Sequence, residues 1–452
     1  MGDRSDKTAQ KLDAQTRVVP ISFASKDDGF AAQMGVLGTL FGDQVVFLPE
    51  VPIGAPIPAE ADAVVFPQLL GEAYARLDEF RAIDRPILII TSEFGTLSMW
   101  DWEIIEYLRG AGVRTLAPYN ADQARTMFRA AAVRSKLRSG TFLMYQDNPG
   151  DGQQASIFKR FWWWEKACRT EMAERLGVRV VYKSYKDLGE RMKEIDDAAA
   201  LAEWKKRDIP SERLADRAKA SAMKLLMTVD ADIAEHGSVL GVGINCLNES
   251  HFSDTTPCLA WSLLYDEKDI MWACEADIVS LATKYMMHRS LEAPTVMTNI
   301  YPFLMGMAAL KHEKIPSFPE ILENPDDHIL VAHCGYFALA PRSFCSSWCL
   351  KPSALGIVNE NSNMMDARFP VGPVTFTKLD PHFRKLFVMQ GKLKGYAQYP
   401  GSDCLNGGII EVSDGHKMMR SVYSHHQCLM TGHQSVDARI VADVFGLEID
   451  EV

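Results

Sequence analysis

Four residues with metal-binding or polar side chains stand where strand-like runs of the sequence end. They are Glu275, Asn299, His333 and His426, in the segments CEADIVSLATKYM, TVMTNIYPF, ILVAHCGYF and YSHHQCLMTGH. Glutamate and histidine are ligands of divalent metals, and asparagine can add a neutral carbonyl oxygen. A lone histidine carries little information, but this combination predicts one site that is assembled from distant segments.

The strands that must position these residues are expected in the middle of the chain. Strand-like runs cover 239–246, 270–275, 295–299 and 328–334. In a parallel sheet, such strand ends form the crevice where ligands bind. Before them, a charged stretch at about 185–236 has apolar residues at helical spacing, which predicts solvated helices.

The first 140 residues alternate short β-branched runs with longer amphipathic segments. Continuous apolar strands of this kind are typical of a parallel sheet that is buried on both faces. The sequence therefore predicts an N-terminal α/β domain over 1–140. Its strands are expected at 17–23, 44–50, 62–68, 86–91 and 113–118.

A second Rossmann-like α/β domain is expected over 141–350, and it should carry most of the site residues. It opens with a strand at 141–146, continues with a helix through 158–177 and returns to a strand at 178–184. The glycine-rich turn GVGINC at 241–246 lacks the third glycine of a dinucleotide fingerprint, so it is weak grounds for nucleotide binding.

The pattern changes to alternation and turns after about residue 350. Segments such as GPVTFTKLD, KLFVMQGKLKG and GGIIEVSDG predict antiparallel strands, followed by the helix SVDARIVADVFG and a last strand LEID. We expect an antiparallel β-barrel domain over 351–452. The predicted fold is therefore two parallel-sheet α/β units followed by a C-terminal β-barrel.

Composition limits the kinds of partner. The chain has 452 residues and a formal net charge of −11, from 59 acidic and 48 basic residues. An acidic protein without a cationic face is poorly suited to nucleic acid or anionic membranes, so neither is expected as a partner. The start of the chain has no apolar secretion segment, Asp6 stands where a myristoylation signal needs Ser or Thr, and no run is long enough to span a bilayer.

The nine cysteines favour a reducing compartment, the cytoplasm, because their number is odd and no Cys-x-x-Cys pair occurs. Cys345 and Cys349 could form half of a zinc site, but no second pair at ligand spacing accompanies them. Buried thiols are the simpler interpretation.

The C-terminal two hundred or so residues resemble the L-fucose and L-arabinose isomerase superfamily. CEADIVSLATKYMM is similar to the segment that carries a catalytic, metal-binding glutamate, which corresponds to Glu275. SHHQCLMTGHQSVDARIVADVFGLEI is similar to the closing His-His segment, whose second histidine, here His426, binds the metal. ILVAHCGYF resembles a His-Cys-Gly stretch that places His333 near the pocket.

The resemblance implies an aldose–ketose isomerase with a divalent cofactor, Mn²⁺ above all, that acts on a sugar through an enediol and forms a homo-oligomer, a trimer or hexamer. Glu275 would serve as base and ligand, His426 as ligand, and His333 would orient the substrate. Proton transfer between two carbons needs a base and a charge that stabilises the enediolate, and a carboxylate with a hard cation supplies both.

Asn299 departs from the family pattern. The family has a second carboxylate about two dozen residues after the first, and that offset falls on Asn299 here. Asparagine can be a neutral ligand or contact the substrate, but it cannot act as a base. Three interpretations stay open: one-base isomerisation, a related reaction on a modified or anionic sugar with Arg342 or Arg368 facing the pocket, and a non-catalytic sugar-binding or regulatory homologue.

Structural roles are the alternatives for the same residues. Glu275 could cap the helix that starts at Asp277, and His426 or His333 could be a buried histidine bonded to backbone. His425 is expected on the opposite face of the strand from His426. Three consecutive tryptophans at 162–164 could offer a stacking surface for a sugar, but core packing or a subunit contact explains them more simply.

Overall fold

The structure is a computed structural model, and it describes residues 15–147, 160–302, 323–333, 340–353, 359–398 and 407–452. The chain divides into two compact units. Unit 1 contains residues 1–136, 286–292 and 436–448, and unit 2 contains 137–285, 293–435 and 449–452. Within the described ranges, no helix combines the length and apolar character needed to cross a bilayer.

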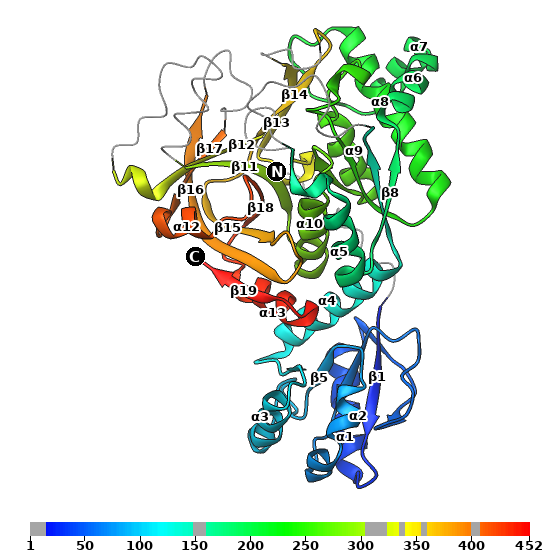
Figure 1. Cartoon of the computed structure of the whole chain (residues 1–452), viewed down its shortest axis with the longest axis vertical. Helices are drawn as coiled ribbons and strands as arrows, with labels where there is room; N and C mark the ends of the chain where they lie inside the picture. The colour runs from blue at the N-terminus through cyan, green and yellow to red at the C-terminus, as the bar shows by residue number, and fades with distance from the viewer. Residues whose placement is uncertain (1–14, 148–159, 303–322, 334–339, 354–358, 399–406) are drawn as a thin grey trace, which may run out of the picture. The chain divides into compact units, whose positions relative to one another are not determined.

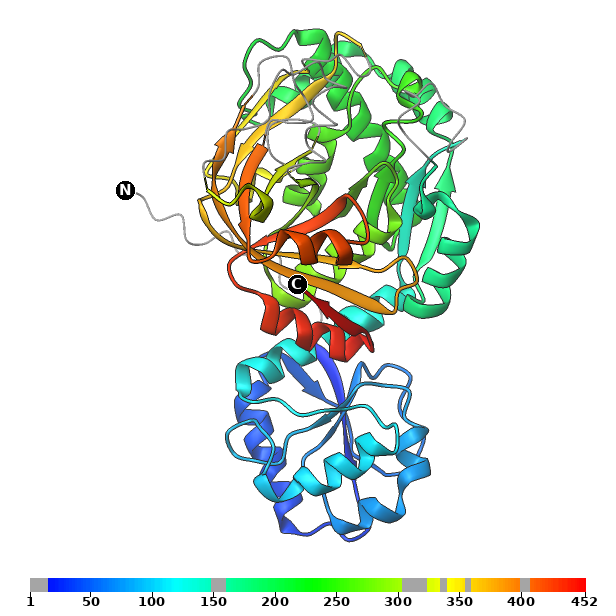
Figure 2. The ribbon, with the colours of Figure 1, turned by 60° about the vertical axis from the view of Figure 1, so that its left-hand side comes forward.

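Unit 1 is built on a parallel sheet with strand order β2-β1-β4-β5-β6, and β3 also pairs with β1. Figure 2 shows these strands at the centre of the unit with helices on either side. The strands are β1 (Thr16–Ser22), β2 (Val45–Phe47), β3 (Val51–Pro52), β4 (Ala63–Phe66), β5 (Ile87–Ile89) and β6 (Thr115–Leu116). The helices are α1 (Asp28–Phe41), α2 (Leu77–Arg81), α3 (Trp102–Gly110) and α4 (Ala121–Ser139).

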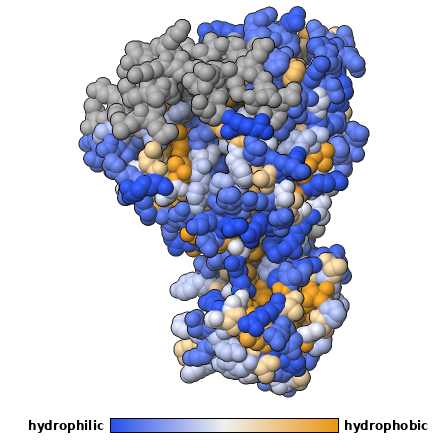
Figure 3. Space-filling view, viewed as in Figure 1, coloured by the Kyte–Doolittle hydropathy of each residue, from blue (hydrophilic) through white to orange (hydrophobic). Residues whose placement is uncertain are grey.

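This sheet confirms the prediction from the β-branched runs. All four residues of β4 have no exposed surface, as expected for a central strand covered on both faces. Apolar side chains also gather on the face of unit 1 that Figure 3 shows. In the described part of the unit, five residues are between 61% and 83% exposed although they are large and apolar or aromatic: Phe94, Met99, Trp100, Trp102 and Tyr119.

Unit 2 begins with a second parallel sheet, in the order β10-β9-β7-β8, which confirms the second α/β unit. Its strands are β7 (Thr141–Tyr145), β8 (Arg179–Lys183), β9 (Val239–Ile244) and β10 (Met271–Cys274). Its helices are α5 (Lys166–Leu176), α6 (Tyr185–Glu194), α7 (Asp197–Lys205), α8 (Asp216–His236), α9 (Cys258–Lys268) and α10 (Ile278–Leu291).

The glycines of GVGINC have a packing role. A Cβ atom at Gly241 would lie 2.7 Å from Leu281 Cδ1, and one at Gly243 would lie 2.6 Å from Met144 Sδ. Both positions therefore need glycine because neighbouring side chains approach the β9 backbone closely.

The rest of unit 2 is dominated by a closed six-stranded antiparallel barrel, which confirms the predicted fold class. Its strand order is β15-β18-β11-β12-β17-β16, and pairing of β15 with β16 closes the ring (Figure 1). Its strands are β11 (Thr295–Pro302), β12 (His328–Ala332), β15 (Gly372–Leu379), β16 (Lys385–Ala397), β17 (Gly407–Val412) and β18 (His426–Thr431). The remaining elements are β13 (Ser347–Pro352), β14 (Asn363–Arg368), α12 (Gly415–Ser421), α13 (Ser435–Phe445) and β19 (Glu448–Glu451).

The strands β11 and β12 belong to this barrel, so the prediction that their ends meet at the edge of a parallel sheet is wrong. Both pair antiparallel with their neighbours. The barrel thus starts well before residue 351, inside the segment assigned to the second domain over 141–350. The N-terminal unit ends at 136, close to the expected 140, but it also includes the later segments 286–292 and 436–448.

Candidate metal centre

Glu275 follows β10 directly and occupies a strained turn. The φ angles of Glu275 and Ala276 are 54° and 50°, in the left-handed region that side chains other than glycine rarely adopt. The turn is held by backbone bonding, because Ala276 N donates to Ile244 O at 3.0 Å. The indole nitrogens of Trp163 and Trp164 also donate to Glu275 O, at 3.2 and 2.7 Å. These contacts fix the direction in which the Glu275 carboxylate leaves the backbone.

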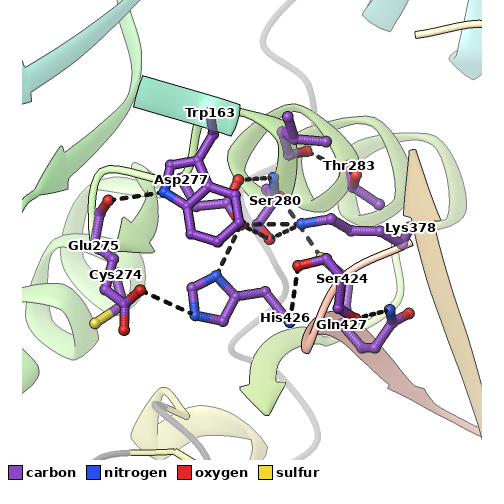
Figure 4. A network of polar contacts seen from close by, with 12 residues as sticks. Trp163, Cys274, Glu275, Asp277, Ser280, Thr283, Lys378, Ser424, His426 and Gln427 are labelled. Atoms are coloured by element: carbon purple, nitrogen blue, oxygen red, sulfur yellow. Dashed lines mark hydrogen bonds and ion pairs between the residues drawn. The ribbon is translucent and has the colours of Figure 1, made fainter. Parts of the chain in front are cut away.

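Asp277 directly precedes α10 and anchors the polar network beside Glu275 (Figure 4). Its Oδ1 accepts from Ser280 N at 2.9 Å, so Asp277 is the helix cap and the prediction that Glu275 could fill this role is wrong. Lys378 Nζ of β15 donates to Asp277 Oδ2 at 3.0 Å. Burial alone would raise the pKa of Asp277, but Lys378 and His426 outweigh it and hold that pKa far below its ordinary value.

His426 opens β18 and points at both carboxylates. Its Nδ1 lies 2.8 Å from Asp277 Oδ2, and its Nε2 lies 3.7 Å from Glu275 Oε2. Because Asp277 is ionised, Nδ1 carries the proton and donates it to this bond, which leaves the Nε2 lone pair facing Glu275. Burial lowers the pKa of His426 to about 4, against the opposing effect of Asp277. A neutral imidazole oriented by a carboxylate is the usual state of a metal ligand.

His425 also joins the cluster. One ligand atom from each of Glu275, His425 and His426 lies within 4.8 Å of the other two. The prediction that His425 lies on the opposite face of a strand is wrong, because β18 begins only at His426 and the alternation does not extend to its neighbour. Burial, followed by repulsion from His426, holds the pKa of His425 well below its ordinary value.

Asn299 reaches the same place through strand register. It lies on β11 directly opposite His426, and cross-strand partners project from the same face of a sheet. Its Nδ2 donates to the Tyr301 hydroxyl at 3.2 Å. Its Oδ1 is buried and has no hydrogen-bond partner within the described ranges. A buried, unbonded carbonyl oxygen of this kind is a suitable neutral ligand.

His333 follows β12 and stacks on His426. The ring centroids are 5.6 Å apart with an interplanar angle of 21°. His333 is 1% exposed, and neither of its ring nitrogens has a hydrogen-bond partner in the part of the chain that the structure describes. Within the described ranges, no backbone group forms a hydrogen bond with the His333 ring, which was the structural alternative for this residue. Its neighbours Cys334 and Gly335 lie outside them.

The tryptophan triplet forms a short 3-10 helix (Trp162–Trp164) ahead of α5. Trp163 and Trp164 are buried, which agrees with the core-packing interpretation, but they pack against the site itself. The Trp163 ring stacks on His426 at 5.1 Å between centroids. Their role is thus to hold the Glu275 turn and one face of the His426 ring.

The structure brings together all four residues that the sequence singled out, although they come from two different sheets. It adds Asp277, Lys378, Trp163 and Trp164, which sequence reasoning did not assign to the site. The two arginines considered for an anionic substrate have other contacts. Arg342 Nη1 donates to Asp208 O, and the Arg368 guanidinium lies over the Tyr396 ring.

Comparison with known proteins adds no assignment: no protein-family model matches the sequence, and no curated protein is detectably similar to it. The chemistry of the cluster therefore has to be judged from its own atoms. One carboxylate, two neutral imidazoles and an amide oxygen form a mixed oxygen and nitrogen donor set, which suits a divalent ion such as Mn²⁺.

Proposed function

We propose that the chain is a divalent-metal-dependent aldose–ketose isomerase of the L-fucose/L-arabinose isomerase type. The observation that carries the proposal is the convergence of Glu275, His426 and Asn299. His426 Nε2 and Asn299 Oδ1 are buried without hydrogen-bond partners among the described residues, and His426 Nε2 faces the Glu275 carboxylate. Burying such atoms without a hydrogen bond costs folding free energy, and a bound ligand would remove that cost.

The donor set fits the expected cofactor. Glu275 and His426 would hold Mn²⁺, Asn299 would add a neutral oxygen, and His425 is a further candidate ligand. The bound ion would hold two adjacent oxygens of the open-chain sugar and stabilise the negative charge of the enediolate. With only one carboxylate among these four residues, the site should bind a divalent ion more weakly than a two-carboxylate site.

The residues of the chain would supply the proton transfer. Glu275 would take the proton from one carbon of the sugar and return it to the neighbouring carbon, because Asn299 cannot accept a proton. The Glu275 turn, held by the hydrogen bond from Trp164, would keep the carboxylate within reach of both carbons of the sugar. His333, with both ring nitrogens available within the described structure, would orient a sugar hydroxyl.

Asn299 also favours a second candidate, a non-catalytic sugar-binding or regulatory homologue. Replacing a carboxylate by an amide removes one negative charge and one possible base from the site. A homologue that lost catalysis but kept its sugar pocket would have such a site, with Glu275 and His426 kept and Asn299 in place of the second carboxylate.

We also propose a cytoplasmic homo-oligomer, a trimer or hexamer. The exposed aromatic residues Trp100, Trp102 and Tyr119 of unit 1 support self-association, since aromatic side chains are enriched where proteins contact one another. Light scattering on the purified protein would give the mass, and a monomer at micromolar concentration would contradict this part of the proposal.

The test of the function combines elemental analysis with a conversion assay. Aldose-to-ketose conversion would be followed over a panel of neutral and anionic sugars, after treatment with a chelator and again after addition of Mn²⁺. Conversion that is lost with chelator and restored by Mn²⁺ is the expected result. A folded protein that binds no metal and converts no sugar would contradict the isomerase and favour the binding protein.

A further inference from the structure

Two thiols meet beside Glu275 although 28 residues separate them in the chain. Cys274 is the last residue of β10, and Cys246 follows β9, its parallel neighbour. Their Sγ atoms lie 3.0 Å apart. Cys274 is buried and Cys246 is partly exposed, so one member of the pair is accessible to solvent.

This distance is close to that of a bond. A disulfide holds its sulfur atoms at about 2.05 Å, so the two sulfurs would have to move together by about 1 Å. Ile244 of β9 is the pairing partner of Cys274, so Cys246 lies two positions beyond that pair, in the turn that follows β9. Because the two Sγ atoms are already 3.0 Å apart, side-chain rotation and a small shift of the turn after each strand would complete the bond.

A small cavity of about 30 Å³ adjoins the pair. It is lined by Cys246, Cys258, Cys274 and Glu275 together with Leu247, Thr256, Pro257 and Met364. A water-sized molecule needs about 10–15 Å³, so a small oxidant fits. Cys258 shares the cavity, yet within the described ranges the three cysteines do not form a group whose ligand atoms all lie within 4.8 Å of one another. The geometry favours a bond between two thiols over a thiolate metal site.

We propose that Cys246 and Cys274 form a reversible disulfide when the protein meets a peroxide, which is a two-electron oxidant. The more exposed Cys246 sulfur attacks a peroxide oxygen, the O–O bond breaks, one water leaves and a sulfenic acid forms. The Cys274 sulfur then displaces the sulfenic oxygen as a second water, and the S–S bond forms. Two thiols and one hydrogen peroxide thus give one disulfide and two waters, and a dithiol reductant reverses the change.

The disulfide acts on the metal centre through the next residue. Glu275 follows Cys274, and its left-handed turn is held by Trp163 and Trp164. Drawing Cys274 toward Cys246 pulls this turn against those bonds and displaces the Glu275 carboxylate from His426. We expect the affinity for Mn²⁺ to fall about tenfold or more, as when other groups that support a metal ligand are disturbed. This consequence rests on the proposed function, whereas formation of the disulfide does not.

Peptide mapping tests the bond itself. The full-length protein would be treated with hydrogen peroxide and then denatured in the presence of an alkylating agent that blocks free thiols. It would then be digested and analysed by mass spectrometry. We expect a peptide that links Cys246 to Cys274 and disappears with dithiothreitol. The Cys246→Ser variant should lose the link, and Cys258→Ser, from the same cavity, should keep it. Absence of the link in folded wild-type protein, or a link from Cys274 to Cys258, would overturn the proposal.

Calorimetric titration with Mn²⁺ tests the consequence. The reduced protein should bind Mn²⁺ about tenfold or more tightly than the oxidised protein, and treatment of the oxidised protein with dithiothreitol should restore the higher affinity. Equal affinities in a cross-linked protein would overturn the coupling to the site. Reduced protein that binds no Mn²⁺ would contradict the proposed function instead, while the mapped disulfide would stand.

Discussion

The Nδ1 atom of His426 lies 2.8 Å from Oδ2 of Asp277, and both side chains are fully buried. The same Asp277 oxygen accepts a hydrogen bond from Lys378. One carboxylate therefore orients the candidate ligand and neutralises a buried ammonium group. This double role links the stability of the site to its ability to bind a metal, and a second change at Lys378 can separate the two.

Asp277→Asn should lose both properties. It leaves the Lys378 charge buried without its counterion, which should lower the free energy of unfolding by about 3–5 kcal/mol, and it should weaken Mn²⁺ binding about 10- to 100-fold. Adding Lys378→Met to this variant should recover much of the free energy of unfolding, but it should not recover the affinity for Mn²⁺. Urea unfolding and Mn²⁺ titration measure the two effects. If the double variant regained full affinity, Asp277 would have only a structural role.

Glu275→Gln should abolish turnover while the fold stays intact, since the two side chains are nearly isosteric. Removal of a general base lowers the rate by about 10²- to 10⁴-fold. The conversion assay gives the rate, and the midpoint of thermal unfolding is the control for folding. A variant that kept most of its activity would rule out Glu275 as the base.

The two neighbouring histidines should differ in their contribution to metal binding. Asp277 orients the His426 ring, so His426→Asn should lower Mn²⁺ occupancy more than His425→Asn does. Elemental analysis after dialysis against a fixed Mn²⁺ concentration provides the comparison. Unchanged occupancy in the His426 variant would show that the metal assignment is wrong, and the reverse order would make His425 the principal ligand.

Lys284 should reduce stability at neutral pH. Its Nζ lies 3.3 Å from the centre of the Trp272 ring and has no hydrogen-bond partner within the described ranges. Burial lowers the pKa of Lys284 well below 10.5, so below the ordinary lysine pKa the folded chain holds this proton less tightly than the unfolded chain does. Lys284→Met should therefore raise the free energy of unfolding at pH 7 by at least about 1 kcal/mol.

The gain from Lys284→Met should shrink as the pH approaches the ordinary lysine value, because the unfolded amine then loses its proton as well. Urea unfolding of both proteins at neutral and alkaline pH gives the difference. A gain that did not change with pH would mean that Lys284 is charged in the folded protein.

Asp232 should make the protein sensitive to acid. Burial opposes ionisation, but hydrogen bonds from Arg191, Lys183 and Tyr145 lower the pKa of Asp232 from 3.8 to about 2. The stabilisation is complete above the unfolded value and is lost as the pH falls from about 4 to about 2. It amounts to about 2 kcal/mol. Asp232→Asn should lose this contribution and show a flatter decline of stability in that range, measured by urea unfolding; an equally steep decline would contradict the assignment.

The sequence predicted the parallel strands well because their apolar runs leave few alternatives. It also singled out Glu275, Asn299, His333 and His426, which the structure brings together. The expectation that each stands where a strand ends holds for Glu275 and His333 but is wrong for Asn299, which lies inside β11, and for His426, which opens β18. The barrel membership of β11 and β12 could not be predicted, because a strand that is buried in a small barrel has the same apolar pattern as one in a parallel sheet.

The supporting residues of the site were harder to find. Asp277 reads as an ordinary helix start, and Lys378 stands in an alternating strand where a solvent-facing lysine is common. Trp163 and Trp164 look like core residues, and only tertiary structure reveals that their indole groups bond to Glu275 O. His425 was misplaced because the first residue of β18 could not be located from the alternation alone.

The candidate centre draws Glu275 from the turn after a strand of the parallel sheet and its remaining ligands from barrel strands or the residue just before one, with His426 the last to be synthesised. A chain still emerging from the ribosome therefore holds only a fraction of the donors, too few to retain a divalent ion against water and competing ligands. Capture of the metal would then report that β18 has paired with β11. Only chains whose barrel is complete would then retain the ion. Chains with an open barrel would stay metal-free, without the stabilisation that binding provides, and would be more open to proteolysis.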